Sequence, residues 1–452
     1  MKQRKIRKKG MALLLAAALT VTVFPRAAKE VHAAALPDST QFAMVDELKA
    51  FNTDDRTENG GDGKNPAKVY FGNNNQQWWI AGSQSGNLTV FAASPLKTKQ
   101  KFESNWNQKK TYDSDWGCDY TSTGDTAPTE VYPNHYGASP LRDTLKGLET
   151  SYFTSEEQKL MNDMTVHTND TLNGSTYSTT DKLYLAYGDY SYDQYITVGA
   201  NEADNLNGGL RIDKGYWGNA GRFWLRAPYL NDSGGALVVW PGFIVDYNGV
   251  NDRSALVPAF ELNLSSVIFA SAAPAASSDG ELSENDAFTL RYDASKHSKT
   301  LGSALVSYDK GKVTLTNVPS GTYLVVQNSD GAWAKQIKTE TVTPGDIDSS
   351  LDSFQNCKVW LETMDDGITY AALASEEKGY SVEVTGSTGL SITSNNGAQE
   401  VAPGAEIQLI TVTADKGYYF PENYPVEAQN GISVTRESYT RLKISGTPTA
   451  DV

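Results

Sequence analysis

The stretch from Arg222 to Leu264, RFWLRAPYLNDSGGALVVWPGFIVDYNGVNDRSALVPAFELNL, decides how the fold of this chain is interpreted. It alternates short apolar runs, rich in aromatic and β-branched residues, with clusters of Gly, Asn, Asp and Pro. Short apolar runs bounded by such turn-forming residues are typical of buried β-strands. The stretch therefore predicts several consecutive strands at the buried end of a β-rich domain.

Two elements of this stretch are Trp224–Pro228 (WLRAP) and Leu256–Phe260 (LVPAF). They resemble the W-L-R-S-P and V-R-P-A elements of a domain family found in secreted and surface proteins of Gram-positive bacteria. Ala227 stands where that family commonly has Ser, and Val257 where it usually has Arg, which suggests local repacking. The resemblance covers about 200 of the 452 residues. It implies a C-type-lectin-like fold similar to relatives of formylglycine-generating enzymes, and it implies no substrate.

The first 33 residues have the three parts of a secretory signal peptide. Six Lys and Arg residues lie among the first nine positions, and an apolar run extends from Met11 to Phe24. Val31-His32-Ala33 offers small or tolerated residues at the positions that a signal peptidase recognises. The apolar run of 14 residues is shorter than the roughly 20 that a transmembrane helix needs. We therefore expect export with cleavage after Ala33 or Ala34, an extracellular or cell-surface location, and no membrane span afterwards.

Charge and cysteine usage argue against two classes of function. Residues 1–33 carry a net charge of +7 within a chain of −15, so the remainder carries −22. A chain this acidic repels polyanions, which disfavours nucleic acid as a partner. Cys118 and Cys357 form no C-x-x-C pair, and the histidines show no H-E-x-x-H spacing, so no zinc site is expected. A disulfide between the two cysteines is disfavoured because they lie in different predicted domains.

Beyond the signal peptide the sequence predicts three β-rich domains, because about 420 residues is too many for one core. Boundaries are expected at a small, polar stretch from Ser271 to Gly280 and at a charged stretch from Ala374 to Gly379. The expected order is a signal peptide at 1–33, an α+β C-type-lectin-like domain at 34–270, a linker at 271–283, an all-β immunoglobulin-like module at 284–373 and a β-rich surface-repeat module at 374–452.

The α+β expectation for residues 34–270 rests on two helix signals placed among strands. Ser139 precedes a proline and a series of leucines at helical spacing, and Thr154 forms a capping box with Glu157. Strands are expected at 69–72, 78–82 and 182–187, and again after position 222. A few helices packed against antiparallel strands define an α+β domain.

The two C-terminal modules show short alternating strands separated by Gly and Pro. Strands are expected at 312–316 and 321–326 in the first module, and at 381–385 and 406–412 in the second. The regular turn signals favour an immunoglobulin-like sandwich for the first module. The second resembles the repeat modules of bacterial surface proteins, which usually act as stalk or spacer.

Several residues of the quoted stretch are candidates for binding a sugar. Aromatic rings stack on the apolar faces of sugars, while Asp and Asn side chains hydrogen-bond their hydroxyls. The candidates are Trp224, Arg226, Trp240, Asp246, Asn248 and Asn251, with Tyr247 and Asp252 beside them. The competing interpretation makes the two tryptophans core residues, Arg226 a buried structural cation and the Asp and Asn residues turn formers.

Support for a metal or for catalysis is thin. An oxygen-rich set offers ligands of the kind calcium prefers, namely Asn201, Glu202, Asp204, Asn205 and Asn207. The EF-hand spacing and the tripeptides of calcium-dependent sugar-binding lectins are absent, so a solvated loop is favoured. Calcium binding is kept as an open alternative, and no other metal ion is expected. No G-x-S-x-G, H-E-x-x-H or phosphate loop is present, so we assign no catalytic residue and no cofactor.

From the sequence we therefore expect a secreted or cell-surface bacterial binding or adhesion protein whose ligand is a glycan or a protein surface. Two alternatives stay open, a carbohydrate-active hydrolase and a structural spacer without a specific ligand. A binder would expose an aromatic patch, a hydrolase would place two carboxylates across a cleft, and a spacer would show neither.

Overall fold

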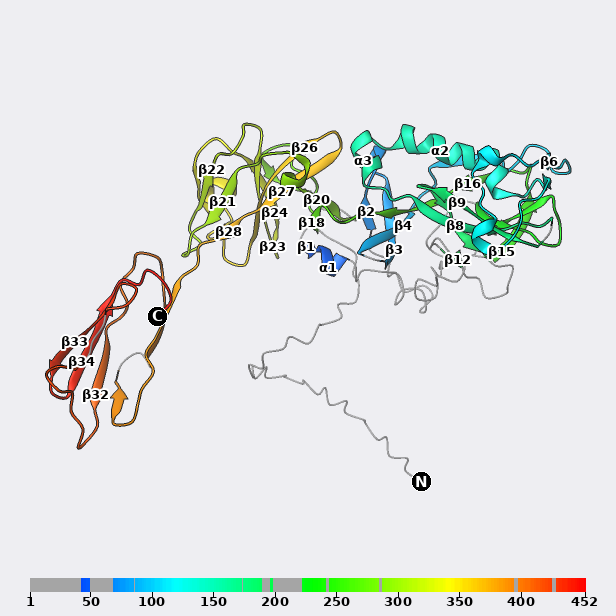
Figure 1. The fold of residues 1–452 in the computed structure, drawn as a ribbon. Coiled ribbons are helices and arrows are strands. Elements are labelled where there is room, and N and C mark those ends of the chain that lie inside the picture. The colour runs from blue at the N-terminus through cyan, green and yellow to red at the C-terminus, as the bar shows by residue number, and fades with distance from the viewer. Residues whose placement is uncertain are drawn as a thin grey trace, which may run out of the picture. The chain divides into compact units, whose positions relative to one another are not determined.

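The structure is a computed structural model that describes residues 42–48, 68–84, 86–172, 174–188, 196–197, 222–240, 244–283, 287–393, 397–424 and 428–452 (Figure 1). The expected signal peptide lies outside the described residues. Strands make up 44% of the structure and helices 12%. The expected α+β class is therefore wrong, and the described chain is mostly β-sheet.

Two five-stranded sheets and three two-stranded ribbons form the tryptophan-rich part of the chain. The first sheet, in the order β10-β17-β4-β3-β2, is antiparallel throughout. Its strands are β2 (Lys68–Tyr70), β3 (Gln77–Gln84), β4 (Asn87–Ala92), β10 (Tyr184–Leu185) and β17 (Pro258–Leu262). The second sheet, in the order β15-β14-β13-β16-β5, contains one parallel pair, β13 with β16. Its strands are β5 (Lys97–Gln100), β13 (Phe223–Pro228), β14 (Gly235–Trp240), β15 (Ile244–Gly249) and β16 (Ser254–Leu256). The ribbons are β6 (Lys110–Thr111) with β7 (Glu130–Val131), β8 (Met164–Asn169) with β9 (Thr176–Asp181), and β11 (Tyr187–Gly188) with β12 (Ile196–Thr197).

The quoted stretch contributes to both sheets. Strands β13 to β16 lie in the second sheet, and β17 follows directly in the first. Val257 is fully buried at the point where the chain crosses from one sheet to the other. An apolar side chain suits this position because a charged group there would need a buried partner.

Both helix signals are confirmed. Helix α2 (Pro140–Tyr152) begins after Ser139, whose hydroxyl accepts a hydrogen bond from the amide of Arg142 at 3.2 Å. Helix α3 (Ser155–Lys159) carries the complete capping box of Thr154 and Glu157. The remaining α-helices of the described part are only four residues long, α1 (Val45–Leu48) and α4 (Pro344–Ile347). Short 3-10 turns occupy Asn73–Asn75, Ser114–Trp116, Thr121–Thr123, Tyr136–Ala138 and Ala294–His297.

An eight-stranded sheet, β1-β18-β20-β27-β26-β23-β24-β19, forms the middle of the chain. Its strands are β1 (Phe42–Met44), β18 (Val267–Ser271), β19 (Gly280–Glu281), β20 (Thr289–Asp293), β23 (Tyr323–Asn328), β24 (Gly331–Gln336), β26 (Lys358–Asp365) and β27 (Ile368–Leu373). A four-stranded sheet shares its apolar core and contains β21 (Ser303–Val306), β22 (Val313–Thr316), β25 (Thr341–Val342) and β28 (Ser375–Glu376). The strands expected at 312–316 and 321–326 are both present, and they lie in different sheets.

The tryptophan-rich part is tied into the eight-stranded sheet at both of its ends. Strand β1 pairs with β18, and β18 pairs in turn with β20. The segment 271–283, expected as a linker, begins in β18 and ends beyond β19, and Ala272 and Ala273 within it are fully buried. Its small side chains therefore fill space beneath the sheet.

The last module has its own apolar core and is coloured orange to red in Figure 1. A four-stranded sheet, β30-β32-β34-β33, is accompanied by the ribbon of β29 and β31. The strands are β29 (Tyr380–Glu383), β30 (Leu390–Ile392), β31 (Ala398–Val401), β32 (Ile410–Ala414), β33 (Ile432–Ser438) and β34 (Arg441–Gly446). The strand expected at 406–412 begins only at Ile410.

Candidate functional site

Trp224 and Arg226 of the predicted sugar-binding set are fully buried on β13. The indole Nε1 of Trp224 donates to the carbonyl of Gln100 at 2.8 Å. Arg226 donates from Nε to the carbonyl of His167 at 3.0 Å and from Nη1 to that of Leu185 at 2.8 Å. Both side chains hold strands together, and neither presents a surface to a ligand.

Trp240, Asp246 and Asn248 lie on one face of the β14–β15 pair, because directly paired residues of antiparallel strands point to the same side. Arg222 joins two of them. Its guanidinium lies 4.9 Å from the centre of the Trp240 ring, and its Nη1 donates to the amide oxygen of Asn248 at 3.2 Å. The amide nitrogen of Asn248 donates to Asp252 at 2.7 Å. This face thus carries a small cation–π and hydrogen-bonded group.

The other predicted ligands do not form a site. Asn251 is exposed in the turn after β15. The oxygen-rich set proposed for calcium, at 201–207, lies outside the described residues. Within the described ranges, no group of three or more His, Cys, Asp or Glu side chains is arranged to hold a metal ion.

Three aromatic side chains lie near two consecutive glycines, Trp106 beside Gly234 and the rings of Tyr229 and Tyr247 beside Gly235. We call Trp106, Tyr229 and Tyr247 the aromatic surface. The rings of Tyr229 and Tyr247 stack in parallel, with centroids 4.0 Å apart. A Cβ atom on Gly235 would lie 3.3 Å from the ring of Tyr247, and one on Gly234 would lie 3.2 Å from the ring of Trp106. A side chain at Gly235 would press on the Tyr247 ring, and one at Gly234 would also lie 2.7 Å from the backbone carbonyl oxygen of Trp106. Trp106 is 54% exposed and Tyr247 is 41% exposed.

A buried asparagine fixes the loop that carries this surface. The amide of Asn134 donates to the carbonyls of Tyr229, Asp232 and Gly235, at 3.4, 3.2 and 2.9 Å. Its oxygen accepts a hydrogen bond from the hydroxyl of Thr171 at 2.7 Å. The loop between β13 and β14 is therefore held by its own backbone hydrogen bonds and by one side chain from a distant part of the sequence.

The aromatic surface has the chemistry of a carbohydrate-binding surface. Exposed Asn105, Asn231 and Asp232 lie in the same loops as its rings and offer hydrogen-bond donors and acceptors. Sugars present apolar C–H faces to rings and hydroxyls to polar side chains. Rings held in advance lose little conformational freedom when a ligand binds.

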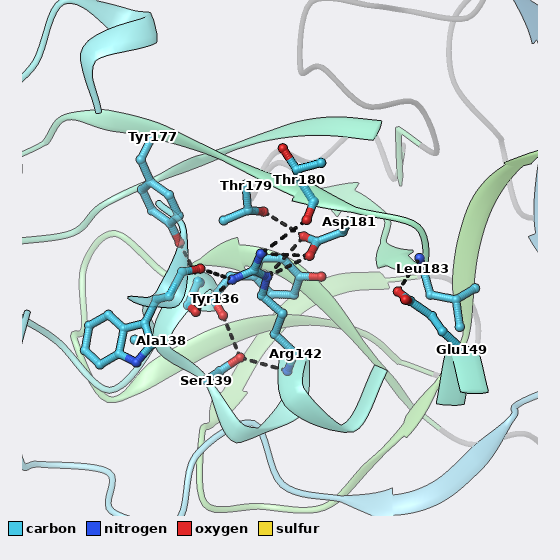
Figure 2. A network of polar contacts seen from close by, with 12 residues as sticks. Tyr136, Ala138, Ser139, Arg142, Glu149, Tyr177, Thr179, Thr180, Asp181 and Leu183 are labelled. Atoms are coloured by element: carbon cyan, nitrogen blue, oxygen red, sulfur yellow. Dashed lines mark hydrogen bonds and ion pairs between the residues drawn. The ribbon is translucent and has the colours of Figure 1, made fainter. Parts of the chain in front are cut away.

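A buried ion pair beneath α2 is structural in character. Figure 2 shows Arg142 extending from α2 to Asp181 on β9. Nε of Arg142 donates to Oδ1 of Asp181 at 2.8 Å, and Nη1 donates to the carbonyls of Trp116 and Gly137 at 2.5 and 3.3 Å. Thr179 donates a further hydrogen bond to Asp181 at 2.7 Å. These contacts occupy both partners and fasten the helix to the strand.

A second group of polar side chains contains a histidine, an aspartate and a cysteine, the residue types used in nucleophilic catalysis. Their protonation states do not suit that chemistry. Tyr120 donates to Asp170 at 2.6 Å, and its hydroxyl lies 2.9 Å from Nε2 of His135. Because Nδ1 of His135 accepts from the amide of Ala138 at 3.1 Å, Nε2 carries the proton of the neutral ring. Burial, with the nearby charges, lowers the pKa of His135 to about 3, and burial raises the pKa of Cys118 to about 12. The thiol therefore stays protonated near neutral pH and is a poor nucleophile.

Sequence reasoning missed Trp106 and Tyr229. A signal for Trp106 exists, because it is a tryptophan within the otherwise polar stretch SNWNQKK and has no apolar neighbour to pack with. Strand alternation also separates Tyr247 from Asp246 and Asn248, since successive residues point to opposite faces.

Among the described residues, no helix combines the length and apolar character needed to cross a membrane. Comparisons with protein-family models, with curated proteins and with solved structures found no match for the chain.

Proposed function

We propose that this protein is exported and binds carbohydrate through the aromatic surface of Trp106, Tyr229 and Tyr247. The observation that supports this is the placement of two exposed rings and one stacked ring against Gly234 and Gly235. Exposed aromatic side chains of this size are costly to leave in water and mark binding surfaces when they cluster. The proposal of export rests on the signal-peptide pattern of residues 1–33.

Carbohydrate is favoured over a protein ligand by the composition of the surroundings. Short polar side chains surround the rings, and the protein beyond the leader carries a net charge of −22. Neutral polyols are compatible with such a charge, because they need hydrogen bonds and C–H contacts and no ion pairs. The ring of Tyr247 stacks on that of Tyr229, and Tyr247 is 41% exposed.

The experiment is a glycan array probed with residues 34–452, with calcium and with chelator. Trp106→Ala and Tyr247→Ala are each expected to weaken binding at least tenfold. Tyr439→Ala is the matched control, because Tyr439 is 66% exposed on the last module and belongs to no part of the aromatic surface. A folded protein that binds no glycan, or binding that survives both substitutions, overturns the proposal. Loss of binding in chelator adds calcium to it.

A further inference from the structure

A cavity of about 220 Å³ lies between the tryptophan-rich part and the eight-stranded sheet. One wall comes from the end of β2 and from α3, with Phe71, Gly72 and Glu157. The opposite wall comes from β20 and the start of β27, with Leu290 and Tyr292. The volume is below the about 300–1,000 Å³ typical of sites for drug-sized ligands, so the cavity suits a ligand of a few heavy atoms.

Backbone contacts fix the two walls relative to each other. The amide of Tyr70 donates to the carbonyl of Phe288 at 2.9 Å, and the amide of Phe288 donates to the carbonyl of Lys68 at 2.7 Å. The hydroxyl of Thr154 donates to the carbonyl of Asp366, in the turn between β26 and β27, at 3.1 Å. The cavity is therefore preformed, which lowers the cost of binding.

Glu157 is a buried carboxylate without a counter-ion in the cavity wall. Its side chain is 5% exposed. Oε1 accepts from the amide of Gly72 at 2.9 Å and Oε2 from that of Thr154 at 2.8 Å. No Lys or Arg in the described part of the chain pairs with it. Burial raises the pKa of this carboxyl group, as expected where no positive charge lies close.

The backbone at Gly72 is built to present its amide to this carboxylate. Gly72 has φ of +85°, and a Cβ there would lie 2.9 Å from the ring of Phe153. Only glycine satisfies both the left-handed backbone and the close approach without strain.

Tyr292 adds a second buried polar group to the same cavity. It is 3% exposed, and its hydroxyl has no hydrogen-bond partner among the residues that the structure describes. Burial and the neighbouring charge of Glu157 raise its pKa, so it is a neutral phenol. A buried hydroxyl without a partner destabilises the fold, so a ligand that bonds it recovers stability.

We propose that this cavity binds a small primary organic ammonium ion. Its charge lies against the Glu157 carboxylate, and one N–H is donated to the hydroxyl of Tyr292. The rings of Phe71 and Tyr292 favour a cation near their faces, and Leu290 contacts the alkyl chain. An anion is excluded by Glu157, and a neutral alcohol of the same size forgoes the attraction between opposite charges. This site is separate from the aromatic surface, so the two proposals stand or fall independently.

The test is calorimetric titration of residues 34–452 with n-butylammonium chloride, and with n-butanol as the neutral ligand of equal size. Saturable binding of the ammonium ion is expected, together with at least tenfold weaker binding of the alcohol. Glu157→Gln is expected to lower ammonium affinity at least tenfold. The amide oxygen of glutamine can still close the capping box with Thr154, but the amide of Gly72 then loses its acceptor, so folding of this variant is checked by circular dichroism. Glu156→Gln is the matched control on the next position of α3, where the carboxylate is solvent-accessible and pairs with Lys159.

Tyr292→Phe is a second variant and removes only the hydroxyl. It tests the proposal if circular dichroism shows that Glu157→Gln is not folded. It is expected to weaken ammonium binding severalfold. Absence of saturable ammonium binding by the unaltered protein overturns the proposal. Equal affinity for the alcohol does the same, as does unchanged affinity in the folded Glu157→Gln or Tyr292→Phe variant.

Discussion

Arg291 and Glu362 form a buried ion pair inside the eight-stranded sheet, with Nε of Arg291 donating to Oε2 of Glu362 at 3.2 Å. Both side chains are almost completely buried. Glu362 also accepts hydrogen bonds from the indole of Trp360 and from the amide of Ala276, each at 2.5 Å. Arg291 donates to the carbonyl of Pro274 at 3.1 Å. The pair thus connects the sheet to the small-residue segment that follows β18.

Glu362→Gln is expected to lower the free energy of unfolding by about 3–5 kcal/mol, because it leaves the buried Arg291 cation without its counter-ion. Urea denaturation of residues 34–452 measures the change. Asp365→Asn is the control on the same strand, since Asp365 pairs with Lys299 at an exposed site and should leave the midpoint in place. Equal midpoints for Glu362→Gln and the unaltered protein would contradict the structural role.

The isolated fragment of residues 34–270 is expected to melt at a lower temperature than the fragment of residues 34–378. The shorter fragment keeps β18 and loses β20, its partner on the far side from β1. It also loses the bridge between Val69 and Phe288. Circular dichroism melts and limited proteolysis of the two fragments measure the difference. A cooperative transition of the shorter fragment at the same temperature would show that the sheet adds no stability to the tryptophan-rich part.

Local signals predicted local structure correctly. The caps at Ser139 and Thr154 identified both helices, because a cap is a contact within one turn of chain. The fold class failed where partners are far apart in sequence. Strand β4 pairs with β17 across most of the tryptophan-rich part, and strands such as β10 are only two residues long. Alternation over so few residues carries no information about register or partner.

Composition also did not indicate the burial of residues 271–280, for a related reason. Small, polar residues at 271–280 predict a solvated linker. Their burial depends on Arg291 and Glu362, which follow much later in the chain and bond the carbonyls and amides of this segment. The candidate site shows the same limit, because Trp106 lies beside Gly234, and this contact joins residues that are far apart in the sequence.

Asn134→Ala is expected to lower the free energy of unfolding by about 1 kcal/mol, because three carbonyls of the loop between β13 and β14 lose their buried side-chain hydrogen bond and keep only a backbone donor each. Glycan binding should weaken as well, since this loop carries Tyr229. Thr171→Val removes only the hydroxyl that orients the amide of Asn134, so a smaller effect on both quantities is expected. Unchanged stability of Asn134→Ala would show that the loop is held by other contacts.

His135 should make the protein less stable in mild acid. Burial, followed by the charges of Arg142 and Lys110, lowers its pKa to about 3 in the folded state, against about 6.5 in the unfolded chain. Between these values the unfolded state binds a proton that the folded state does not. The folded state is therefore at no disadvantage above about pH 6.5 and loses up to about 1.4 kcal/mol for each pH unit below it, until about pH 3.

The measurement is urea denaturation between pH 7 and pH 4 for the unaltered protein and for His135→Gln. Buried carboxyl groups such as Asp170 and Glu149 have raised pKa values and favour the folded state in acid, but they are present in both proteins. The difference in unfolding free energy between the two proteins isolates the histidine. It should change in favour of His135→Gln as the pH falls through 6.5. A difference that stays constant over this range would mean that His135 is protonated in the folded protein, because its proton would then be bound equally in both states.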